Sequence, residues 1–261
     1  MNKILEINLP KAFYESYQLG KIVFTGLHAN IYHCTHTNSQ TLFVAKIYSQ
    51  NSPQLISLKV SPKNEYKIIK SFDHPHIIKA YDYFENEEFI CILFENCQHG
   101  DLIDFMEKNF IEKDIKGIMF QILETLSFLH GKNMAHRDIK LENICVSSDL
   151  KIRLIDFECC INDSDDLGKK NVKGTALYFS PEKVNKMFYI RMQSSEKPSD
   201  IWAAGIVMFY LLNIKQGNIF YNEEHWENIS FEAKDLVQRM LILDPAYRIT
   251  ANQALSHLFF K

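Results

Sequence analysis

The sequence changes character once along its length, and this change limits the folds open to the chain. Up to about residue 95, the residue patterns predict mostly β-strands, in the segments KIVFTG, IYHCTHT, TLFVAKIY, AYDYF and FICILFE. A helical stretch around residues 64–71 interrupts these strands. From Asp101 onward the spacing is mostly helical, apart from a hairpin after residue 143. We therefore expect an α+β fold: a small sheet-rich half, a larger helical half, and a ligand-binding cleft between them.

Composition excludes several classes of protein. The 261 residues, 46% of them apolar, are enough for one large domain or two tightly joined lobes with a real core. A net charge of −3 gives no basic excess for nucleic acid, and no apolar run approaches the roughly 18 residues of a membrane helix. The first residues lack the long apolar segment of a secretion signal. We expect no nucleic-acid or membrane partner, and a location in the cytoplasm or nucleus.

The cysteines indicate a reducing environment. All six lie in mostly apolar or strand-like stretches without paired CxxC spacing, at positions 34, 91, 97, 145, 159 and 160. This pattern predicts reduced core residues and neither a disulfide framework nor a zinc site. The sequence gives no indication of the oligomeric state.

The stretch AHRDIKLENICV, residues 135–146, places six polar side chains directly between two apolar elements. Before it, apolar residues at helical spacing predict a helix with a buried face that ends near residues 130–131; they are Ile115, Ile118, Met119, Ile122, Leu126 and Leu129. After it, residues 143–147 and 151–156 predict two strands of a hairpin. A two-residue turn at Asp149 and Leu150 would pair Ile144 with Ile155 and place Asn143 beside Asp156.

This geometry predicts a metal site. Amide and carboxylate oxygens from Asn143 and Asp156 suit a magnesium ion that phosphate oxygens also hold. Asp138 comes five residues before Asn143 and can return to the same place, where it could accept a proton from an attacking hydroxyl. For any one of these residues, an Asx-type turn or a surface salt bridge is the alternative.

The motif HRDIKLEN, followed 13 residues after its Asn by DF, resembles the catalytic loop and metal-binding motif of the eukaryotic protein kinases. The resemblance runs from about Val23 to Phe260. Lys46 in FVAKIY resembles the lysine that holds the nucleotide phosphates, and Glu65 resembles its partner on helix C. GTALYFSPE (174–182) resembles the segment that seats a substrate peptide. SDIWAAG (199–205) resembles the helix that anchors the catalytic loop, and Arg248 resembles the arginine that pairs with Glu182.

The resemblance implies a bilobal fold, with a mainly antiparallel sheet and helix C in the N-lobe and a helical C-lobe. It implies an N-terminal extension over residues 1–17, an N-lobe over 18–94, a hinge over 95–98 and a C-lobe over 99–261. It also implies ATP and Mg²⁺ as cofactors and a protein substrate. The implied catalytic residues are Asp138, Lys140, Lys46 and Glu65, the metal ligands are Asn143 and Asp156, and the nucleotide-binding residues are Val23, Gly26, Ile31, Val44, Lys46, Glu95, Cys97, Asp101 and Cys145.

Other residues refine this expectation. Lys140 in DIKLEN and the "GT" before residue 176 resemble the serine/threonine class, and KLEN resembles the calcium/calmodulin-dependent and AMP-activated branch. Asp101 and Glu142 fall where related kinases bind a basic residue upstream of the acceptor, although Asp101 could equally cap a helix. Phe94 occupies the gatekeeper place. The resemblance implies packing roles for His136 and Phe157, and an electrostatic contact between Arg137 and the activation segment.

The chain departs from the family at several places. Of the GxGxxG loop only Gly26 is kept, with Phe24 and Ala29 at the other glycine positions, and Glu158 turns DFG into DFE. Val44 replaces a smaller residue that usually covers the adenine. We therefore consider three functions: an active serine/threonine kinase, a pseudokinase scaffold with weak or no catalysis, and a small-molecule kinase.

The activation segment raises a question of regulation. Kinases with an Arg before the catalytic Asp are often switched on by a phosphate that this Arg binds. Asn171 occupies the usual phosphate position, and Ser164 is the one hydroxyl residue between Asp156 and Gly174. We expect either ordering without phosphate, through Asp163, Asp165 and Asp166, or a different switch; a disordered charged loop is the alternative.

Overall fold

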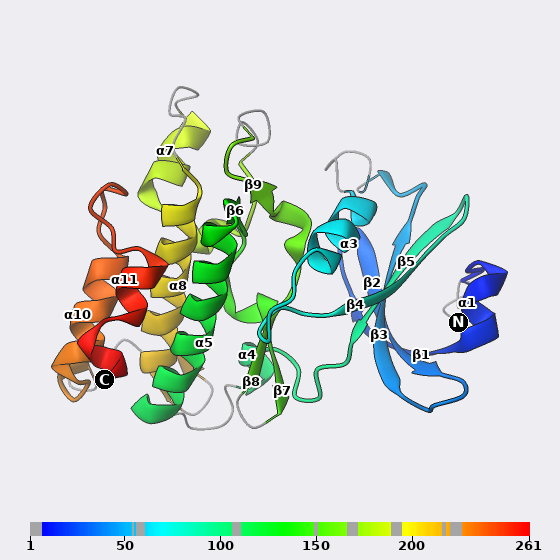
Figure 1. The fold of residues 1–261 in the computed structure, drawn as a ribbon, viewed down its shortest axis with the longest axis horizontal. Coiled ribbons are helices and arrows are strands. Elements are labelled where there is room, and N and C mark those ends of the chain that lie inside the picture. Colours follow the sequence, from blue (N-terminus) through cyan, green and yellow to red (C-terminus); the bar gives the residue numbers. More distant parts are fainter. Residues whose placement is uncertain are drawn as a thin grey trace. The chain divides into compact units, whose positions relative to one another are not determined.

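The computed structural model describes residues 7–53, 55, 61–105, 111–148, 151–165, 172–188, 195–215, 218–219 and 226–261. The chain divides into two compact units (Figure 1). The first unit comprises Met1–Asp73 and Ile78–Asn96, and the second comprises His74–Ile77 and Cys97–Lys261. The short segment His74–Ile77 therefore groups with the second unit, whereas the resemblance implies an N-lobe that includes it.

Among the described residues, the first unit is built on an antiparallel sheet of five strands in the order β1-β2-β3-β5-β4. All the expected strand segments form, and the helical stretch begins two residues early because Ser61 caps it and Pro62 suits its first position. The elements are α1 (Lys11–Ser16), β1 (Tyr17–Thr25), β2 (Ala29–His36), β3 (Leu42–Ser49), α3 (Pro62–Lys70), β4 (Ala80–Glu85) and β5 (Phe89–Glu95).

The two faces of this sheet carry different side chains. Alternation along β3 places Phe43, Ala45 and Ile47 in the apolar core, together with residues of β1, β2 and β5. Helix α1 completes this core with Phe13, which is fully buried and lies edge-on to Phe84. The intervening β3 residues, Lys46 among them, therefore point to the opposite face.

The second unit is mainly helical, and α5 and α8 pack side by side in it (Figure 1). The apolar stripe expected on the helix before the catalytic loop is buried along α5. The helices are α4 (Leu102–Phe105), α5 (Glu112–Gly131), α7 (Pro181–Phe188), α8 (Lys197–Leu212), α10 (Phe231–Met240) and α11 (Ala251–Leu255), with 3-10 turns η1 (Leu141–Asn143), η2 (Phe157–Cys159), η3 (Ala176–Tyr178) and η4 (Leu258–Phe260). Two-stranded pairs join β6 (Met134–Ala135) to β9 (Ile161–Asn162), β7 (Ile144–Ser148) to β8 (Lys151–Leu154), and β10 (Ile214–Lys215) to β11 (Asn218–Ile219).

The register expected for the β7–β8 hairpin is wrong by one residue. Ile144 pairs with Leu154 and not with Ile155, because a bulge between Val146 and Ser148 inserts one residue into β7. The two turn residues assumed in that expectation lie outside the described residues. Because the Ile155 amide donates to the Asn143 carbonyl at 2.9 Å, Asp156 still follows directly beside Asn143.

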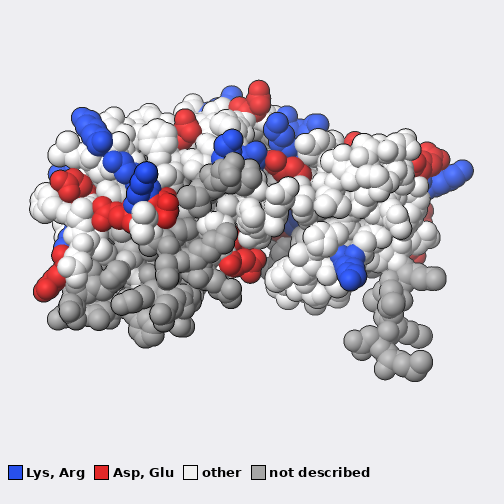
Figure 2. Space-filling model, turned by 90° about the horizontal axis from the view of Figure 1, so that it is seen from below, with Lys and Arg blue, Asp and Glu red and all other residues white. Residues whose placement is uncertain are grey.

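The expected α+β organisation, an antiparallel sheet with a helix in the first unit and a mainly helical second unit, is confirmed. None of the helices in the described residues is long and apolar enough to cross a membrane. The face drawn in Figure 2 carries Lys and Arg side chains interspersed with Asp and Glu. All six cysteines are free, and three of them are buried.

Candidate active site

The expected pair of Lys46 and Glu65 forms within the first unit. The Lys46 Nζ lies 3.2 Å from both carboxylate oxygens of Glu65, which is almost completely buried on α3. The hydroxyl of Tyr48, two residues along β3, donates to Glu65 at 2.7 Å. The ammonium group is thus held at a fixed place on the sheet face opposite α1, where it could bind phosphate oxygens.

Strand register gathers other nucleotide-binding candidates on the same face. Ile31 lies directly across β2–β3 from Lys46, and Val44 lies directly across β3–β5 from Phe94. Phe94 is buried, as a gatekeeper would be. Glu95 ends β5, and its side chain accepts a hydrogen bond from the Lys79 amide at 2.9 Å.

The remnant of the glycine loop has a local structural reason. A Cβ on Gly26 would lie 2.7 Å from the Ala29 carbonyl oxygen, and the Gly26 amide donates to that oxygen at 3.0 Å. The β1–β2 turn therefore requires glycine at this position. Val23 and Phe24 are more than half exposed at the end of β1. The single glycine reflects this turn and does not by itself indicate phosphate binding.

In the second unit, Asp200 of α8 anchors the catalytic loop. Its carboxylate accepts hydrogen bonds from the amides of His136 and Arg137, at 2.9 and 2.7 Å, and contacts His130 at 3.1 Å. Burial alone would raise the pKa of Asp200, but the bonds from His130 and Arg137 outweigh it and lower this pKa. The motif SDIWAAG thus supplies the anchor that the resemblance implies.

Groups of three residues, Thr175, Asn143 and Lys140, contact the Asp138 carboxylate. One oxygen accepts from the Thr175 amide at 2.8 Å and from its hydroxyl at 2.9 Å. The other accepts from Asn143 Nδ2 and contacts Lys140 Nζ, both at 3.0 Å. Burial raises the pKa of Asp138, but the neighbouring Lys140 and the hydroxyl of Thr175 more than offset this effect, so the group is ionised at neutral pH.

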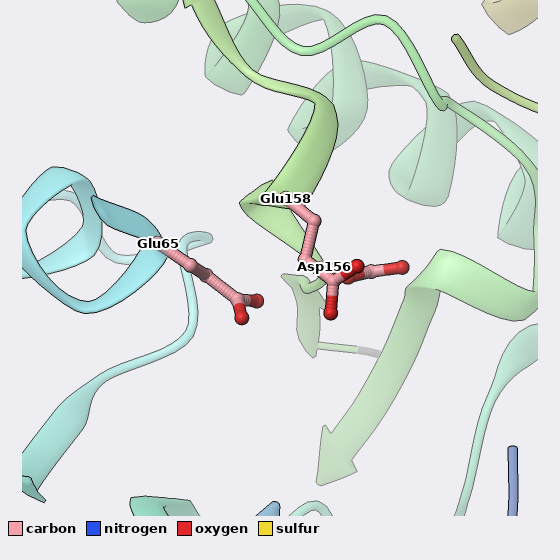
Figure 3. Close-up of side chains that lie close together, drawn as sticks. All are labelled: Glu65, Asp156 and Glu158. Atoms are coloured by element: carbon pink, nitrogen blue, oxygen red, sulfur yellow. The ribbon is translucent and has the colours of Figure 1, made fainter. Parts of the chain in front are cut away.

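Asn143 and Asp156 are suited to hold a divalent cation. Both described hydrogen bonds of the Asn143 side chain use its nitrogen, which turns to Asp138, so its oxygen is the atom suited to bind a cation. Asp156 adopts a left-handed conformation after β8, with φ of 63°. Figure 3 draws Asp156 and Glu158 of this unit, along with Glu65 from α3 of the first unit. A Glu158 oxygen lies within 4.8 Å of an Asp156 oxygen, so DFE adds a charge at the candidate metal ligand.

Three further nucleotide-binding candidates meet in the second unit. An isolated antiparallel bridge joins Asp101 to Cys145, and the neighbouring amide of His99 donates to the Val146 carbonyl. The Cys145 thiol is in hydrogen-bonding contact with Cys97, and this contact together with burial raises its pKa. Asp101 also caps α4, because its side chain accepts from the amide of residue 104 at 3.0 Å.

The implied packing role of His136 and Phe157 agrees with the structure. Both side chains are fully buried, and their rings meet edge to face at 4.7 Å. The His136 ring also contacts the Ile155 carbonyl at 3.1 Å, which ties the catalytic loop to the strand before Asp156. Burial lowers the pKa of His136.

The segment expected to seat a substrate, residues 174–182, is fixed at both ends. Arg248 donates two hydrogen bonds to Glu182, at 2.6 and 2.9 Å, as expected. Gly174 has φ of +112°, and a Cβ there would lie 2.4 Å from the Arg137 carbonyl oxygen. Only glycine therefore allows the next residue, Thr175, to approach Asp138.

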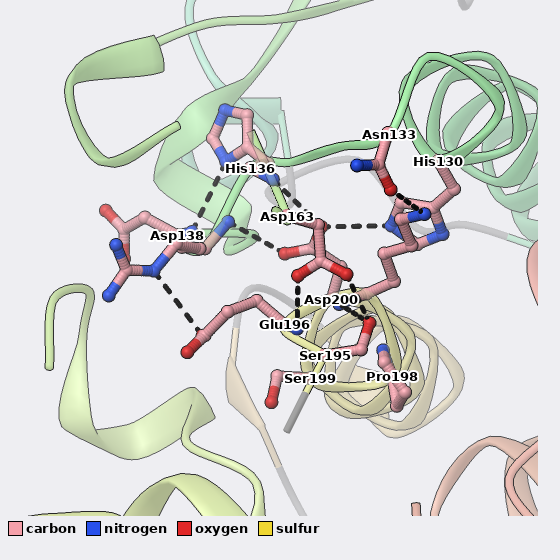
Figure 4. A network of polar contacts seen from close by, with 12 residues as sticks. His130, Asn133, His136, Asp138, Asp163, Ser195, Glu196, Pro198, Ser199 and Asp200 are labelled. Atoms are coloured by element: carbon pink, nitrogen blue, oxygen red, sulfur yellow. Dashed lines mark hydrogen bonds and ion pairs between the residues drawn. The ribbon is translucent and has the colours of Figure 1, made fainter. Parts of the chain in front are cut away.

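The expected contact between Arg137 and the activation segment stays a prediction. The described ion pair of Arg137 is with Glu196, at 3.4 Å, and Glu196 follows the activation segment in the chain (Figure 4). Asp163 contacts Ser195 and Glu196. The Ser164 hydroxyl accepts a hydrogen bond from Asn133 at 2.7 Å. Asn171 and Asp166 lie outside the described residues.

Sequence reasoning missed several residues of the site. The GT motif indicates only the serine/threonine class, although its Thr175 contacts both Asp138 and Lys140. Lys183 is buried and donates to the Arg137 carbonyl at 2.9 Å; burial lowers its pKa. Glu196 and Tyr48 had no motif to indicate them. Lys183 directly follows the SPE motif. Its position next to the motif's glutamate was the signal that could have indicated a role at the site.

An enzyme that moves phosphoryl groups needs fixed positive charge and a fixed acid more than a nucleophile of its own. The Lys46–Glu65 pair of the first unit and the Asp138 carboxylate of the second are groups of these two kinds, as expected for a phosphotransferase. Residues 17–260 match the model of the "Protein kinase domain" family. The chain belongs to the protein kinase family.

Curated relatives agree with this assignment. The human "Phosphorylase b kinase gamma catalytic chain, liver/testis isoform" is 31% identical over 96% of this chain and 68% of its own length. "Calcium-dependent protein kinase 3" of Plasmodium yoelii yoelii is 34% identical over 76% of this chain and 40% of its own length. A "Probable myosin light chain kinase" of Dictyostelium discoideum is 30% identical over 92% and 82%. The expected resemblance to ATP-dependent serine/threonine kinases near the calcium/calmodulin-dependent branch is confirmed.

Proposed function

We propose that this chain is a catalytically active serine/threonine protein kinase that uses ATP and Mg²⁺. The observation that carries the proposal is the Asp138 carboxylate, which Thr175, Lys140 and Asn143 hold in one orientation. Such a group can accept the hydrogen bond of a substrate hydroxyl and take its proton as the oxygen attacks the γ-phosphorus, while the bond from that phosphorus to the bridging oxygen breaks and ADP leaves. Its lowered pKa keeps it in the accepting form at neutral pH.

Each unit would contribute its own groups to the reaction. Lys46, held by Glu65 and Tyr48, would bind nucleotide phosphates. Asn143 and Asp156 would hold Mg²⁺, which neutralises charge on the phosphates when bound. Lys140, whose pKa Asp138 raises despite burial, would stay protonated and stabilise the transferred phosphoryl group.

The direct test is radiolabel transfer from ATP to a serine peptide with basic residues. We expect activity in the wild type and a loss of about 10²-fold or more in Asp138→Asn. The matched control Glu227→Gln, an exposed carboxylate, should keep wild-type activity. An inactive wild type, or an Asp138→Asn variant as active as the wild type, would contradict the proposal.

A binding measurement accompanies the activity test. ATP should raise the melting temperature of the wild type more with Mg²⁺ than without it, because a ligand of the native state stabilises that state. The Asp156→Ala variant should lose the part that depends on Mg²⁺. A shift that is equal with and without Mg²⁺ in both proteins would contradict the metal assignment.

We also propose a preference for a basic residue upstream of the acceptor. Asp101 and Glu142 lie close enough for the Glu142 charge to contribute to a raised pKa of Asp101, although burial is the main cause. Two neighbouring carboxylates favour a guanidinium between them. In a series of peptides, each upstream Arg is replaced by Ala in turn. One of these replacements should raise the KM for the peptide about tenfold, and an Asp101→Asn variant should not distinguish this peptide from the others.

A pseudokinase scaffold is the second candidate, and Glu158 favours it. Its carboxylate lies close to that of Asp156 and would repel phosphate oxygens. We expect Glu158→Gly to raise activity severalfold in an active kinase. If instead neither the wild type nor Glu158→Gly transfers phosphate, while both bind a protein partner, the scaffold function is the correct one.

We further propose that the chain works in the cytoplasm or nucleus on protein substrates. Its free, partly buried thiols support a reducing compartment. Imaging of a fluorescent fusion, with fractionation of the untagged chain as its control, tests this location. Accumulation in the secretory pathway would contradict it.

A further inference from the structure

The residue before the proposed catalytic aspartate forms a buried ion pair. Arg137 precedes Asp138, and its Nε lies 3.4 Å from Glu196 Oε2. The two side chains are only 1% and 5% exposed, respectively. A guanidinium buried to this extent requires an anionic group nearby, because burial of an uncompensated charge is strongly unfavourable. Glu196 supplies such a group from outside the activation segment.

Glu196 is itself held by a second carboxylate (Figure 4). Its amide donates to Asp163 Oδ1 at 2.8 Å, and the hydroxyl of Ser195 donates to Asp163 Oδ2 at 2.7 Å. The Asp163 amide donates in turn to the Asn133 carbonyl at 2.7 Å. The residues before α8 are therefore tied to the end of β9 and to the turn after α5.

The Arg137 backbone connects this network to Asp138. Its amide donates to Asp200, its carbonyl accepts from Lys183 at 2.9 Å, and its φ is +72°. A non-glycine residue in this left-handed conformation persists only where its surroundings hold it. Loss of a group that holds the Arg137 side chain should therefore displace the Asp138 carboxylate relative to Thr175.

We propose that Glu196 is a positioning residue for catalysis. It is a carboxylate built into the fold that holds Arg137, and through it Asp138, so that the catalytic loop is ordered without a phosphate on Ser164. Asp163 acts one step further away by holding Glu196. The Ser164 hydroxyl meets Asn133 and not this ion pair. The inference rests on the proposed kinase function and names how that activity is maintained.

The test compares kinetics of phosphatase-treated proteins. Glu196→Gln should lower kcat at least tenfold with the KM for ATP within twofold of the wild type. Phosphatase treatment of the wild type, Ser164→Ala and the exposed control Glu227→Gln should each leave kcat within twofold. Full kcat in Glu196→Gln would overturn the proposal, and so would loss of wild-type activity after phosphatase treatment.

A double-mutant cycle separates positioning from general damage. If Glu196 acts through Arg137, the double variant Arg137→Gln/Glu196→Gln should lose no more kcat than the worse single variant. Multiplied losses would overturn the proposal. Glu196→Asp keeps the charge but shortens the reach, and its kcat should fall between those of the wild type and Glu196→Gln even if the latter folds poorly.

A readout without catalysis distinguishes this proposal from the function on which it rests. Backbone hydrogen exchange over residues 134–144 should be faster in Glu196→Gln than in the wild type and Glu227→Gln. An inactive wild type with this difference would contradict the kinase function but retain the positioning role. Equal exchange in all three proteins would overturn the positioning role whatever the activity.

Discussion

At the scale of single residues, the site consists of short-range contacts between groups that lie far apart in the sequence. The motif HRDIKLEN located Asp138, Lys140 and Asn143 because their spacing places them on one loop. The contact between Asp138 and Thr175 could not be inferred in the same way, because it depends on how the substrate segment folds back. The same limit applies to Glu196, which reaches Arg137 only through the packing of α8.

Thr175 provides a direct test at this scale. Thr175→Val removes the hydroxyl that bonds Asp138 and Lys140 but keeps the amide bond to Asp138. We expect kcat to fall about tenfold, the lower end of what loss of a hydrogen bond to a charged group costs, and the KM for ATP to stay unchanged. Steady-state kinetics beside the exposed control Thr41→Val checks this. A change confined to KM would show that Thr175 acts on nucleotide binding instead.

At the scale of elements, strand-type residue patterns predicted the strands of the first unit: β3 buries alternate residues, whereas β5 is an apolar run that is buried except at its two ends. The β7–β8 register failed because nothing in the sequence signals the bulge between Val146 and Ser148. Helix α1 was expected only as part of an extension. It has six residues, no side-chain cap and one buried residue, so its position depends on packing that a local pattern does not show.

The packing of α1 leads to a stability prediction. Phe13 is fully buried among Tyr17 and Phe84. Phe13→Ala should lower the free energy of unfolding by about 3 kcal/mol or more, as for other large-to-small core changes. Urea denaturation measures this loss, and Glu15→Ala, exposed on the same helix, should cost less than about 0.5 kcal/mol. Equal effects of the two variants would contradict the assignment of α1 to the core.

At the scale of the whole molecule, the change from strands to helices predicted both units and their order. It did not predict that His74–Ile77 groups with the second unit, because that depends on contacts such as the amide of Leu154 donating to the His76 carbonyl at 2.8 Å. The domain boundaries, the roles of the site residues and the substrate stay predictions. The pairs Lys46–Glu65 and Glu182–Arg248 are confirmed as contacts.

Buried titratable groups predict how stability depends on pH. The folded state lowers the pKa of Asp138, Asp200 and Glu182 below their ordinary values of 3.8, 3.8 and 4.5. The unfolded chain therefore binds more protons, and the stability these groups supply is present above about pH 5 and lost on acidification. His136, with a pKa lowered from 6.5 by burial, adds an earlier loss below that value.

We expect the melting temperature to fall gently below about pH 6.5 and steeply below about pH 4.5. Thermal unfolding followed by circular dichroism from pH 7.5 to 3.5 measures this. Glu182→Gln should be less stable at pH 7 but show a shallower loss in acid. A melting temperature that stays constant down to pH 3.5 would contradict these pKa directions.

The cramped backbone at Gly174 has a consequence for how this sequence can vary. The Arg137 carbonyl occupies the space that the methyl group of an alanine would need. Even alanine at position 174 would therefore move Thr175 away from Asp138. In a saturation library selected for phosphate transfer, codon 174 should therefore tolerate no replacement. If the same library is selected only for folding, a few replacements should be tolerated, because they disturb catalysis before they disturb the packing of the core.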